Sequence, residues 1–331
     1  MIDPILKDDW HPVAEAGQLR DGGPVGASLL GQDLALWRSS DGALHAWDDR
    51  CPHRGTRLSI GAVAGDTLTC AYHGWRFATD GHCIHVPSQP EVKAPDACVR
   101  SFSVEERYGL IWACVGRPAC AVLPFPEYAD LHLRKVLCGP YEVDASGPRV
   151  VENFLDMAHF AYVHAGILGD PSRTGVRDYR VDQWSDAAGG SGLIATECFA
   201  FQPQTNSLAH GGSDVEYTYR VVRPLTAILT KLPQAQHGFR EAISLHVQPI
   251  HEEKSRVWMI LAMTDSTTSE QQLREFQDRI FMQDKPILES QTPRRLPLAP
   301  RSEISVRADR MSMAYRKYLR ELGLVYGVVN G

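Results

Sequence analysis

The chain has 331 residues, of which 44% are hydrophobic, and a formal net charge of −6 with both signs mixed along it. This length predicts about two domains or one large one, with enough apolar side chains for a sizeable core. The charge balance does not favour a nucleic-acid surface, and no run approaches the roughly 20 apolar residues of a membrane-spanning helix. The N-terminal residues carry early aspartates instead of a basic segment followed by an apolar one, so no export signal is predicted and the expected location is the cytoplasm.

The chain contains eight cysteines, an even number that would suggest disulfides in a secreted protein. Because no export signal supports that interpretation, a reducing compartment makes thiol chemistry or metal ligation more plausible. Only Cys51 and Cys70 lie close to histidines at the spacing of metal ligands. The other six are expected to be small buried hydrophobic residues.

The first third of the chain is predicted to form short strands separated by Gly, Asp and Pro turns. Expected strands include residues 34–37, 44–47, 67–71 and 110–114. Three prolines within residues 116–126 indicate a linker. This places a domain boundary between residues 118 and 119.

Beyond the linker, the sequence predicts helices together with a second group of strands. The expected elements are a helix near 149–165, strands near 194–201, 217–222, 243–248 and 257–263, a long helix over 269–290 and a last helix near 312–322. In the long helix Leu273, Phe276, Ile280 and Ile287 recur at helical spacing. Strands followed by helices, without strict alternation, indicate an α+β fold.

Two short motifs in the β-rich third offer metal ligands. Cys51-Pro-His53-Arg-Gly and Cys70-Ala-Tyr-His73-Gly-Trp each provide one thiolate and one imidazole. A Rieske [2Fe–2S] centre takes two cysteines on one iron and two histidines on the other. The alternative is structural zinc, which also accepts two cysteines and two histidines. Zinc fingers usually place like ligands in the same half, so the mixed halves favour the iron–sulfur cluster.

A second group of candidate ligands lies in the predicted helix near 149–165. His159 and His164 are five residues apart, whereas neighbours on one face of a regular α-helix are three or four apart. To share one metal, the helix must widen or end between them. Two histidines and one carboxylate, with open positions, form the facial triad of non-heme Fe(II) sites that activate oxygen.

The carboxylate of this triad must come from elsewhere in the chain, and Asp284 in the long helix is our candidate. It lies on the apolar stripe of that helix, where a carboxylate is costly to bury unless it is paired or bound to a metal. Asp284 could instead cap a helix or pair with an arginine. Asp278 and Glu289 are the next candidate ligands.

Together the motifs resemble those of the Rieske non-heme iron oxygenases, α-subunit type, and the resemblance covers nearly the whole chain. The two Cys/His halves look like the family's cluster motif, and Asp156-Met-Ala-His159 followed by His164 looks like its iron motif. The resemblance implies an N-terminal antiparallel β domain with the cluster, residues 1–118. It implies a C-terminal helix-grip domain on an antiparallel sheet with the mononuclear iron, residues 119–331. Head-to-tail trimers are also implied, with Asp156 joining His159 to a cluster histidine of the next subunit and Asn153 behind the ligands.

Within this family, three segments look most like methylxanthine N-demethylases and the hydroxylases of saxitoxin biosynthesis: 106–112, 283–291 and 309–323. Residues 168–170 and 321–327 favour the second subgroup. Both subgroups imply monooxygenation of nitrogen-rich small molecules. The chain is shorter than the large subunits of α3β3 ring dioxygenases, so an α3 homotrimer is expected.

The resemblance implies an O2-dependent oxidoreductase of EC 1.14 type that hydroxylates a C–H bond or removes an N- or O-methyl group from a small aromatic or nitrogen-rich molecule. Electrons from NADH would arrive through a flavin and iron–sulfur reductase, with or without a separate ferredoxin. The sequence has no G-x-G-x-x-G nucleotide motif of its own, which agrees with an outside reductase. Two alternatives stay open: a cis-dihydroxylating ring dioxygenase, and a Rieske electron-transfer protein without oxygen chemistry. Asp156, His159, His164 and Asp284 argue against the latter.

Three arginines near the cluster motifs, Arg54, Arg57 and Arg76, could dock an acidic partner or could simply be solvated surface charges. The substrate pocket is expected near His164 and the second group of strands. Candidate lining residues, each of which could equally be plain core, are Phe199, Phe201, Leu229 and His246.

Overall fold

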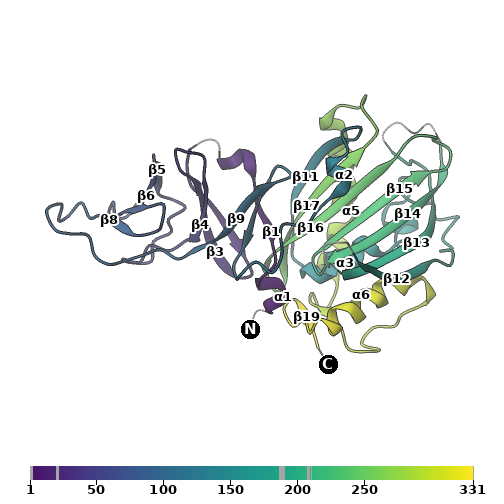
Figure 1. Cartoon of the computed structure of the whole chain (residues 1–331). Helices are drawn as coiled ribbons and strands as arrows, with labels where there is room; N and C mark the ends of the chain where they lie inside the picture. Colours follow the sequence, from purple (N-terminus) through teal and green to yellow (C-terminus); the bar gives the residue numbers. More distant parts are fainter. Residues whose placement is uncertain (1–2, 20–21, 186–190, 207–208, 210, 331) are drawn as a thin grey trace. The chain divides into compact units, whose positions relative to one another are not determined.

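The computed structural model describes residues 3–19, 22–185, 191–206, 209 and 211–330. These residues fall into two compact units, one extending to Leu123 and the other beginning at Pro124 (Figure 1). Both units are built on antiparallel sheets, and the long helices belong to the second, so the expected α+β class is confirmed. No helix in the described ranges is long and apolar enough to cross a membrane.

The first unit contains two antiparallel sheets. The larger has the strand order β1-β10-β9-β4-β3-β2, and the smaller β5-β6-β7-β8. Its elements are α1 Pro4–Lys7, β1 His11–Glu15, η1 Ala16–Leu19, β2 Val25–Leu29, β3 Gln32–Arg38, β4 Leu44–Asp48, β5 Ala62–Ala64, β6 Thr67–Thr69, β7 Arg76–Ala78, β8 Cys83–His85, β9 Ser101–Arg107 and β10 Leu110–Cys114.

One hydrophobic core of this unit joins the two sheets beneath the Cys/His motifs. Trp37 of β3 and Trp47 of β4 pack edge to face, with ring centroids 4.9 Å apart. Phe77 from the smaller sheet lies in the same core, as do Cys51 and Cys70. The two motif cysteines are therefore buried at the base of their loops, which fixes both loops to a rigid support.

The second unit is dominated by a seven-stranded antiparallel sheet with the order β11-β17-β16-β15-β14-β13-β12, whose strands run side by side in Figure 1. A short parallel pair, β18-β19, lies near the C-terminus. The elements are α2 Pro126–Ala129, β11 Arg134–Val143, α3 Gly147–Leu155, α4 Phe160–Val163, β12 Arg180–Ser185, β13 Ser191–Gln202, β14 Ser213–Arg223, β15 Thr226–Pro233, β16 Glu241–His251, β17 Lys254–Met263, α5 Glu270–Ser290, β18 Leu296–Pro297, η2 Arg307–Asp309, α6 Arg310–Glu321 and β19 Val328–Val329.

Side-chain alternation explains how this sheet forms a cavity wall. Along β14, alternate residues from Ser213 to Val221 are buried, as expected of a strand with one covered face. β17 is buried on both faces over most of its length, which its continuous apolar run allows. Helix α5 begins at a capping box formed by Ser269 and Gln272 and packs beside β11.

The named strands and the helices over 269–290 and 312–322 occur close to their expected positions. Of the six cysteines outside the motifs, which were expected to be buried, Cys98 and Cys120 are exposed, so that expectation was wrong for these two. Two expectations about the helices were also wrong. The helix near 149–165 is two helices, α3 and α4, separated by residues 156–159. On α5, Ile287 is 43% exposed and is not part of the buried stripe. The residues buried along this helix are Leu273, Gln277, Phe281, Asp284 and Leu288.

Candidate metal centres

The two Cys/His loops of the first unit repeat the same backbone turn. The Gly55 N–H donates to the Cys51 carbonyl at 2.9 Å, and the Gly74 N–H donates to the Cys70 carbonyl at 3.0 Å. Both glycines have positive φ, +74° and +69°, a conformation that other residues rarely adopt. A Cβ on Gly74 would lie 3.0 Å from Pro87 Cγ, because the segment after β8 passes across the second loop. The turns therefore present a thiol and an imidazole from each loop in the same way.

The four candidate ligands of these loops face one another. Cys51 and Cys70 are each 2% exposed. Burial, with a smaller contribution from the neighbouring Cys70, raises the pKa of the Cys51 thiol to about 11. The rings of His53 and His73 meet edge to face, with centroids 4.6 Å apart, and His53 Nδ1 is buried with no hydrogen-bond partner. A buried nitrogen without a partner is rare except where an ion or water completes it, so this donor set fits a Rieske cluster.

One side of this donor set is held by aromatic packing and the other is open. Trp75 stacks on His53, with centroids 4.5 Å apart and planes 7° from parallel. His73 is exposed and lies against Tyr72, which is also exposed. An electron could therefore enter or leave through the exposed His73 edge.

The break between α3 and α4 explains the five-residue spacing of His159 and His164. The Asp156 carboxylate accepts the backbone N–H groups of Ala158 at 3.0 Å and His159 at 3.2 Å, which ends α3 and turns the chain. His159 is the N-cap of the single-turn helix α4, and His164 is its C-cap. The interruption lies before the first histidine, whereas the sequence predicted it between the two.

The structure brings His159, His164 and Asp284 together. Asp284 Oδ1 lies 3.1 Å from His164 Nε2 and 3.5 Å from His159 Nε2. One ligand atom from each residue lies within 4.8 Å of the others. His164 is 1% exposed and Asp284 8%. Two imidazoles and one carboxylate converging from one side are the donor set of a facial triad, which leaves other positions open.

A further polar group holds each of these three residues. His159 Nδ1 lies 2.9 Å from Asp156 Oδ2, and His164 Nδ1 lies 2.9 Å from Gln283 Oε1. Asn153 Nδ2 donates to Asp284 Oδ1 at 3.4 Å. Both histidines thus direct Nε2 toward Asp284, the arrangement usual for metal-binding histidines. Gln283 was not predicted from the sequence, since nothing in its local pattern marks it.

The pKa shifts at this site follow from the same contacts. Burial acts to raise the pKa of Asp156, but hydrogen bonds from His159 and Ala158 outweigh it and hold the pKa below its usual range. Burial acts to lower the pKa of His164, but Asp284 and Gln283 outweigh it and raise the pKa. Asp156 is therefore an ionised acceptor for the His159 ring.

The two next candidate ligands after Asp284, Asp278 and Glu289, have other partners. Asp278 accepts a hydrogen bond from the Tyr141 hydroxyl at 2.5 Å. Glu289 pairs with Lys285 and accepts the Asp144 N–H at 3.0 Å. Neither belongs to the group of converging ligand atoms.

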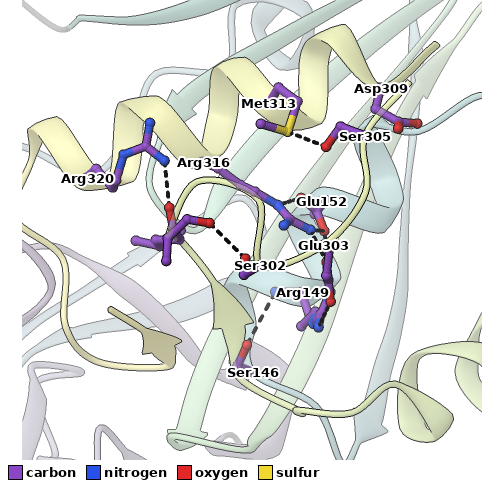
Figure 2. Close-up of polar contacts among 12 residues, drawn as sticks. Ser146, Arg149, Glu152, Ser302, Glu303, Ser305, Asp309, Met313, Arg316 and Arg320 are labelled. Carbon is purple, nitrogen blue, oxygen red and sulfur yellow. Dashed lines mark hydrogen bonds and ion pairs between the residues drawn. The ribbon is translucent and has the colours of Figure 1, made fainter. Parts of the chain in front are cut away.

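A buried ion-pair network fixes α3, the helix that leads into the iron motif (Figure 2). Glu152 of α3 accepts two hydrogen bonds from Arg316 of α6, at 2.5 and 2.8 Å. Glu303 accepts from Arg316 at 2.6 Å and from Arg149 of α3 at 2.7 Å. Burial raises the pKa of Glu152, and the two arginines work against that shift. The network joins α3 to α6 through Glu152, the residue that precedes Asn153.

An apolar cavity opens beside the triad. Its walls come from α3, α4, α5 and strands β14 to β17, and the lining includes Asn153, His159, His164, Tyr217, Leu229, Lys231, Glu241, Ile243, Leu261, Phe276, Gln277 and Asp284. Among the four lining residues guessed from the sequence, Leu229 lies on this cavity. Phe199 and Phe201 line a separate hollow with Arg173 and Arg177, and His246 is fully buried beside Ser244.

Two family models match the chain. Residues 9–102 match the Rieske [2Fe-2S] domain, and residues 143–324 match the vanillate O-demethylase oxygenase C-terminal domain. Each match contains one of the two candidate metal centres.

Proteins with described activities and structures are similar over most of the chain. Methylxanthine N1-demethylase NdmA of Pseudomonas putida is 33% identical over 328 residues, covering 96% of this chain and 89% of that protein. The probable methylxanthine N7-demethylase NdmC of Pseudomonas sp. (strain TJI-51) is 40% identical over 226 residues, covering 68% of this chain and 78% of that protein. A solved structure of Pseudomonas putida CBB5 NdmA with caffeine has a TM-score of 0.81 at 32% identity, covering 96% of this chain and 91% of that one.

Proposed function

Because this chain belongs to the Rieske non-heme iron oxygenases, as the oxygenase component of a multicomponent system, we propose that it removes an N-methyl group from a small nitrogen heterocycle. In this proposal residues 1–118 bind the cluster and residues 119–331 bind the iron. The cluster ligands are Cys51, His53, Cys70 and His73, and the iron ligands are His159, His164 and Asp284. The similarity to N-demethylases supports the reaction type, and the preference for saxitoxin-type hydroxylases stays a prediction.

One observation carries the proposal: three ligand atoms, from His159, His164 and Asp284, converge at the wall of an apolar cavity. Such a cavity can hold a small, largely apolar molecule with one carbon close to the metal. A Rieske electron-transfer protein would need neither the triad nor the cavity.

When bound, the cluster supplies single electrons and the iron activates O2 for insertion into a C–H bond. NADH supplies two electrons through the reductase, and O2 with two protons yields one hydroxyl group and one water. Hydroxylation of an N-methyl carbon gives N–CH2OH, which breaks its C–N bond to release formaldehyde and leave N–H.

The chain's own residues position the reactants and exclude water. Asp156 and Gln283 each accept a hydrogen bond from an Nδ1–H, so both imidazoles keep the tautomer that directs Nε2 to the metal position. Asn153 restrains the Asp284 carboxylate. Leu229 and Leu261 contribute apolar wall to the cavity, which keeps water away from the bound substrate.

As an oxygenase component, the chain is expected to receive its electrons from a partner reductase. We further propose a head-to-tail homotrimer in which Asp156 accepts one hydrogen bond from His159 and a second from a cluster histidine of the next subunit. Whether a ferredoxin intervenes depends on the reductase. An iron–sulfur centre in the reductase would make a separate ferredoxin unnecessary.

The test is metal analysis combined with a turnover screen. Protein purified anaerobically should be brown and contain three irons and two inorganic sulfides per chain. With NADH and a surrogate reductase, N-methylated heterocycles should yield formaldehyde in equal amount to NADH and O2 consumed. A colourless zinc protein would contradict the cluster, a cis-diol product would indicate a dioxygenase, and reduction without O2 uptake would indicate an electron carrier.

A further inference from the structure

A buried ion pair lies in the wall of the cavity that the proposed reaction would use. Lys231 of β15 and Glu241 of β16 are directly opposite each other in the sheet, and Lys231 Nζ lies 3.0 Å from Glu241 Oε2. The side chains are 6% and 8% exposed. Both line the same cavity as the triad.

The pair forms a polar row next to an apolar one. Across the sheet, Tyr217 is opposite Lys231, and Glu241 is opposite Met263. The neighbouring row along the strands consists of Tyr219, Leu229, Ile243 and Leu261, and it lines the cavity too. Two full charges thus lie at the margin of a surface built for apolar contact.

Stability alone does not account for this pair. Removing two charges from water costs several kcal/mol for each ion, and a well-packed apolar pair of similar volume is often at least as stable. Lys231 and Glu241 could be an interstrand tie, but the apolar row beside them already joins β15 to β16. Their position on the cavity suggests a role in binding.

The pair has unused hydrogen-bonding capacity. An ammonium group has three donors, and a carboxylate has two oxygens that each accept more than one bond. Among the residues that the structure describes, neither Lys231 nor Glu241 has a polar partner besides the other. Of the other polar groups of the wall, Tyr217 accepts from Gln202 and Asp265 accepts from the turn at Thr267, whereas the Tyr219 hydroxyl is buried without a hydrogen-bond partner in the described part of the chain. The pair can therefore offer a donor and an acceptor side by side to a molecule in the cavity.

We propose that Lys231 and Glu241 recognise a cyclic amide or imide edge of the substrate, with Lys231 donating to its carbonyl and Glu241 accepting from the adjacent ring N–H. This inference rests on the proposed function and names its substrate class: an N-methylated heterocycle that keeps at least one free N–H beside a carbonyl. Amide bond lengths place the nitrogen and oxygen of such an edge about 2.3 Å apart. Two parallel hydrogen bonds to groups 3.0 Å apart fit that spacing.

Charge balance favours this class over a zwitterion. The ion pair is neutral as a unit, so a neutral ligand leaves no uncompensated charge in the apolar cavity. A zwitterionic amino acid would lose the hydration of two charged groups on entry, whereas an amide edge loses that of two neutral groups. A fully N-methylated ring would place a methyl group against the Glu241 carboxylate. Glu241 would then accept no hydrogen bond from the ligand, which costs binding free energy.

The test compares ligands that differ only at one ring nitrogen. Theobromine carries hydrogen on the nitrogen between its two carbonyls, where caffeine carries methyl. 1-Methyluracil and 1,3-dimethyluracil differ in the same way on a smaller ring. Calorimetric titration of the fully metallated enzyme under anaerobic conditions measures binding without turnover. We expect the N–H member of each pair to bind at least about tenfold more tightly, the contribution of a hydrogen bond to a charged group.

The variant to titrate is the double substitution Lys231→Met with Glu241→Leu, which leaves no unpaired charge. It should bind both members of each pair equally. The control is Arg220→Met with Glu127→Leu, which removes a partly buried ion pair of the same unit that does not line the cavity and should keep the wild-type preference. If the double variant fails to fold, Glu241→Gln is titrated instead and should reduce the preference by at least about threefold.

The outcomes separate this inference from the proposed function. Equal binding of both members by the wild type, or a preference that survives in the double variant, overturns the recognition of an N–H edge. Binding of N,N-dimethylglycine in place of every heterocycle overturns it in favour of a zwitterion, and absence of binding by all four heterocycles overturns it too. Formaldehyde release from a fully N-methylated ring as fast as from its N–H counterpart would leave the demethylase function intact and overturn only the inference.

Discussion

Asp156 Oδ2 lies 2.9 Å from His159 Nδ1, and the same carboxylate accepts the backbone N–H groups of Ala158 and His159. One side chain therefore both shapes the turn that separates α3 from α4 and orients an imidazole of the triad. The two carboxylate oxygens have different partners, since Oδ1 accepts the Ala158 N–H and Oδ2 accepts the His159 N–H and faces the His159 ring. An amide side chain has one acceptor oxygen and could therefore replace only one of these two oxygens.

Asp156→Asn should retain both metals and lower turnover by about 100-fold, because the amide keeps one oxygen for the Ala158 N–H of the turn but offers the His159 ring no charged acceptor. The measurements are iron content, the cluster absorption spectrum and formaldehyde release. Asp178→Asn, which changes an exposed carboxylate of the same unit, is the matched control and should behave as wild type. Loss of the mononuclear iron from Asp156→Asn would instead show that Asp156 is required for the fold of the site.

Asp284→Ala and His159→Ala should each remove the mononuclear iron and abolish oxygenation, while the cluster spectrum stays intact. Two remaining protein ligands make a weak site for Fe(II). Asp278→Asn serves as the control, since this carboxylate lies on the same helix and contacts Tyr141 instead. Full iron content and activity in Asp284→Ala would disprove the carboxylate assignment and direct attention to Glu289.

The contrast between Asp284 and Lys231 shows which parts of the site can be predicted from sequence. Asp284 stands out because a carboxylate falls among apolar residues at helical period, and that period is a local property. The Cys51 and Cys70 motifs are likewise local, since each contains its own turn and two ligands. Lys231 and Glu241 meet only through the register between β15 and β16, which depends on the packing of the whole sheet.

Three further misses have the same origin. Residues 156–159 could continue helix α3 or leave it at Asp156, and the local sequence allows both. The helix ends there because the Asp156 carboxylate contacts the His159 ring, a contact that the sequence alone does not predict. Gln283 precedes Asp284 on α5, and its contact with His164 arises from the way that helix lies against α4. Ile287 fits the helical period but lies outside the buried stripe, because tertiary packing selects which part of a broad apolar face is covered.

Arg316→Met should destabilise the second unit by about 3–5 kcal/mol, because it leaves the buried Glu152 carboxylate without its two-bond partner. Thermal unfolding should show the loss as a lower Tm, and mononuclear iron content should fall as α3 loosens. The double variant Arg316→Met with Glu152→Leu should recover most of the stability, since Arg149 and Glu303 still pair. Arg320→Met, one turn further along α6, is the control with a small expected effect. A single variant as stable as wild type would mean that the network contributes little.

Reduction of the cluster by the reductase should slow as ionic strength rises, if exposed arginines beside the cluster loops steer an acidic partner. Arg54, Arg57 and Arg76 are all exposed, and Arg57 has only a long contact to Asp33, at 3.7 Å. Changing all three to Gln should slow reduction at low salt and flatten the salt dependence, measured by stopped-flow absorbance. Arg117→Gln, another exposed arginine of the first unit, should leave both unchanged. A wild-type rate independent of salt would count against docking through these residues.

Electrons should pass between subunits, from the cluster of one chain to the iron of the next. The Asp156 carboxylate still has acceptor positions after its bonds to His159 and the turn. His73 is exposed on the first unit, so its ring can reach a second chain. A carboxylate that bridges an exposed cluster histidine of one chain and an iron histidine of another provides a short path for the electron.

Complementation between two inactive variants tests this path. Cys70→Ala removes the cluster and His159→Ala removes the mononuclear iron, so each homotrimer should be inactive. Co-expressed with different affinity tags and purified through both, mixed trimers should recover part of the activity, because an intact cluster in one chain can serve the intact iron of its neighbour. The control replaces Cys70→Ala by Cys114→Ala, which changes a buried cysteine of the first unit outside the motifs. It gives the activity of the same mixed assembly when every chain keeps its cluster. Doubly tagged oligomers without any turnover would show either that electrons remain within one chain or that the assembly is not a head-to-tail ring.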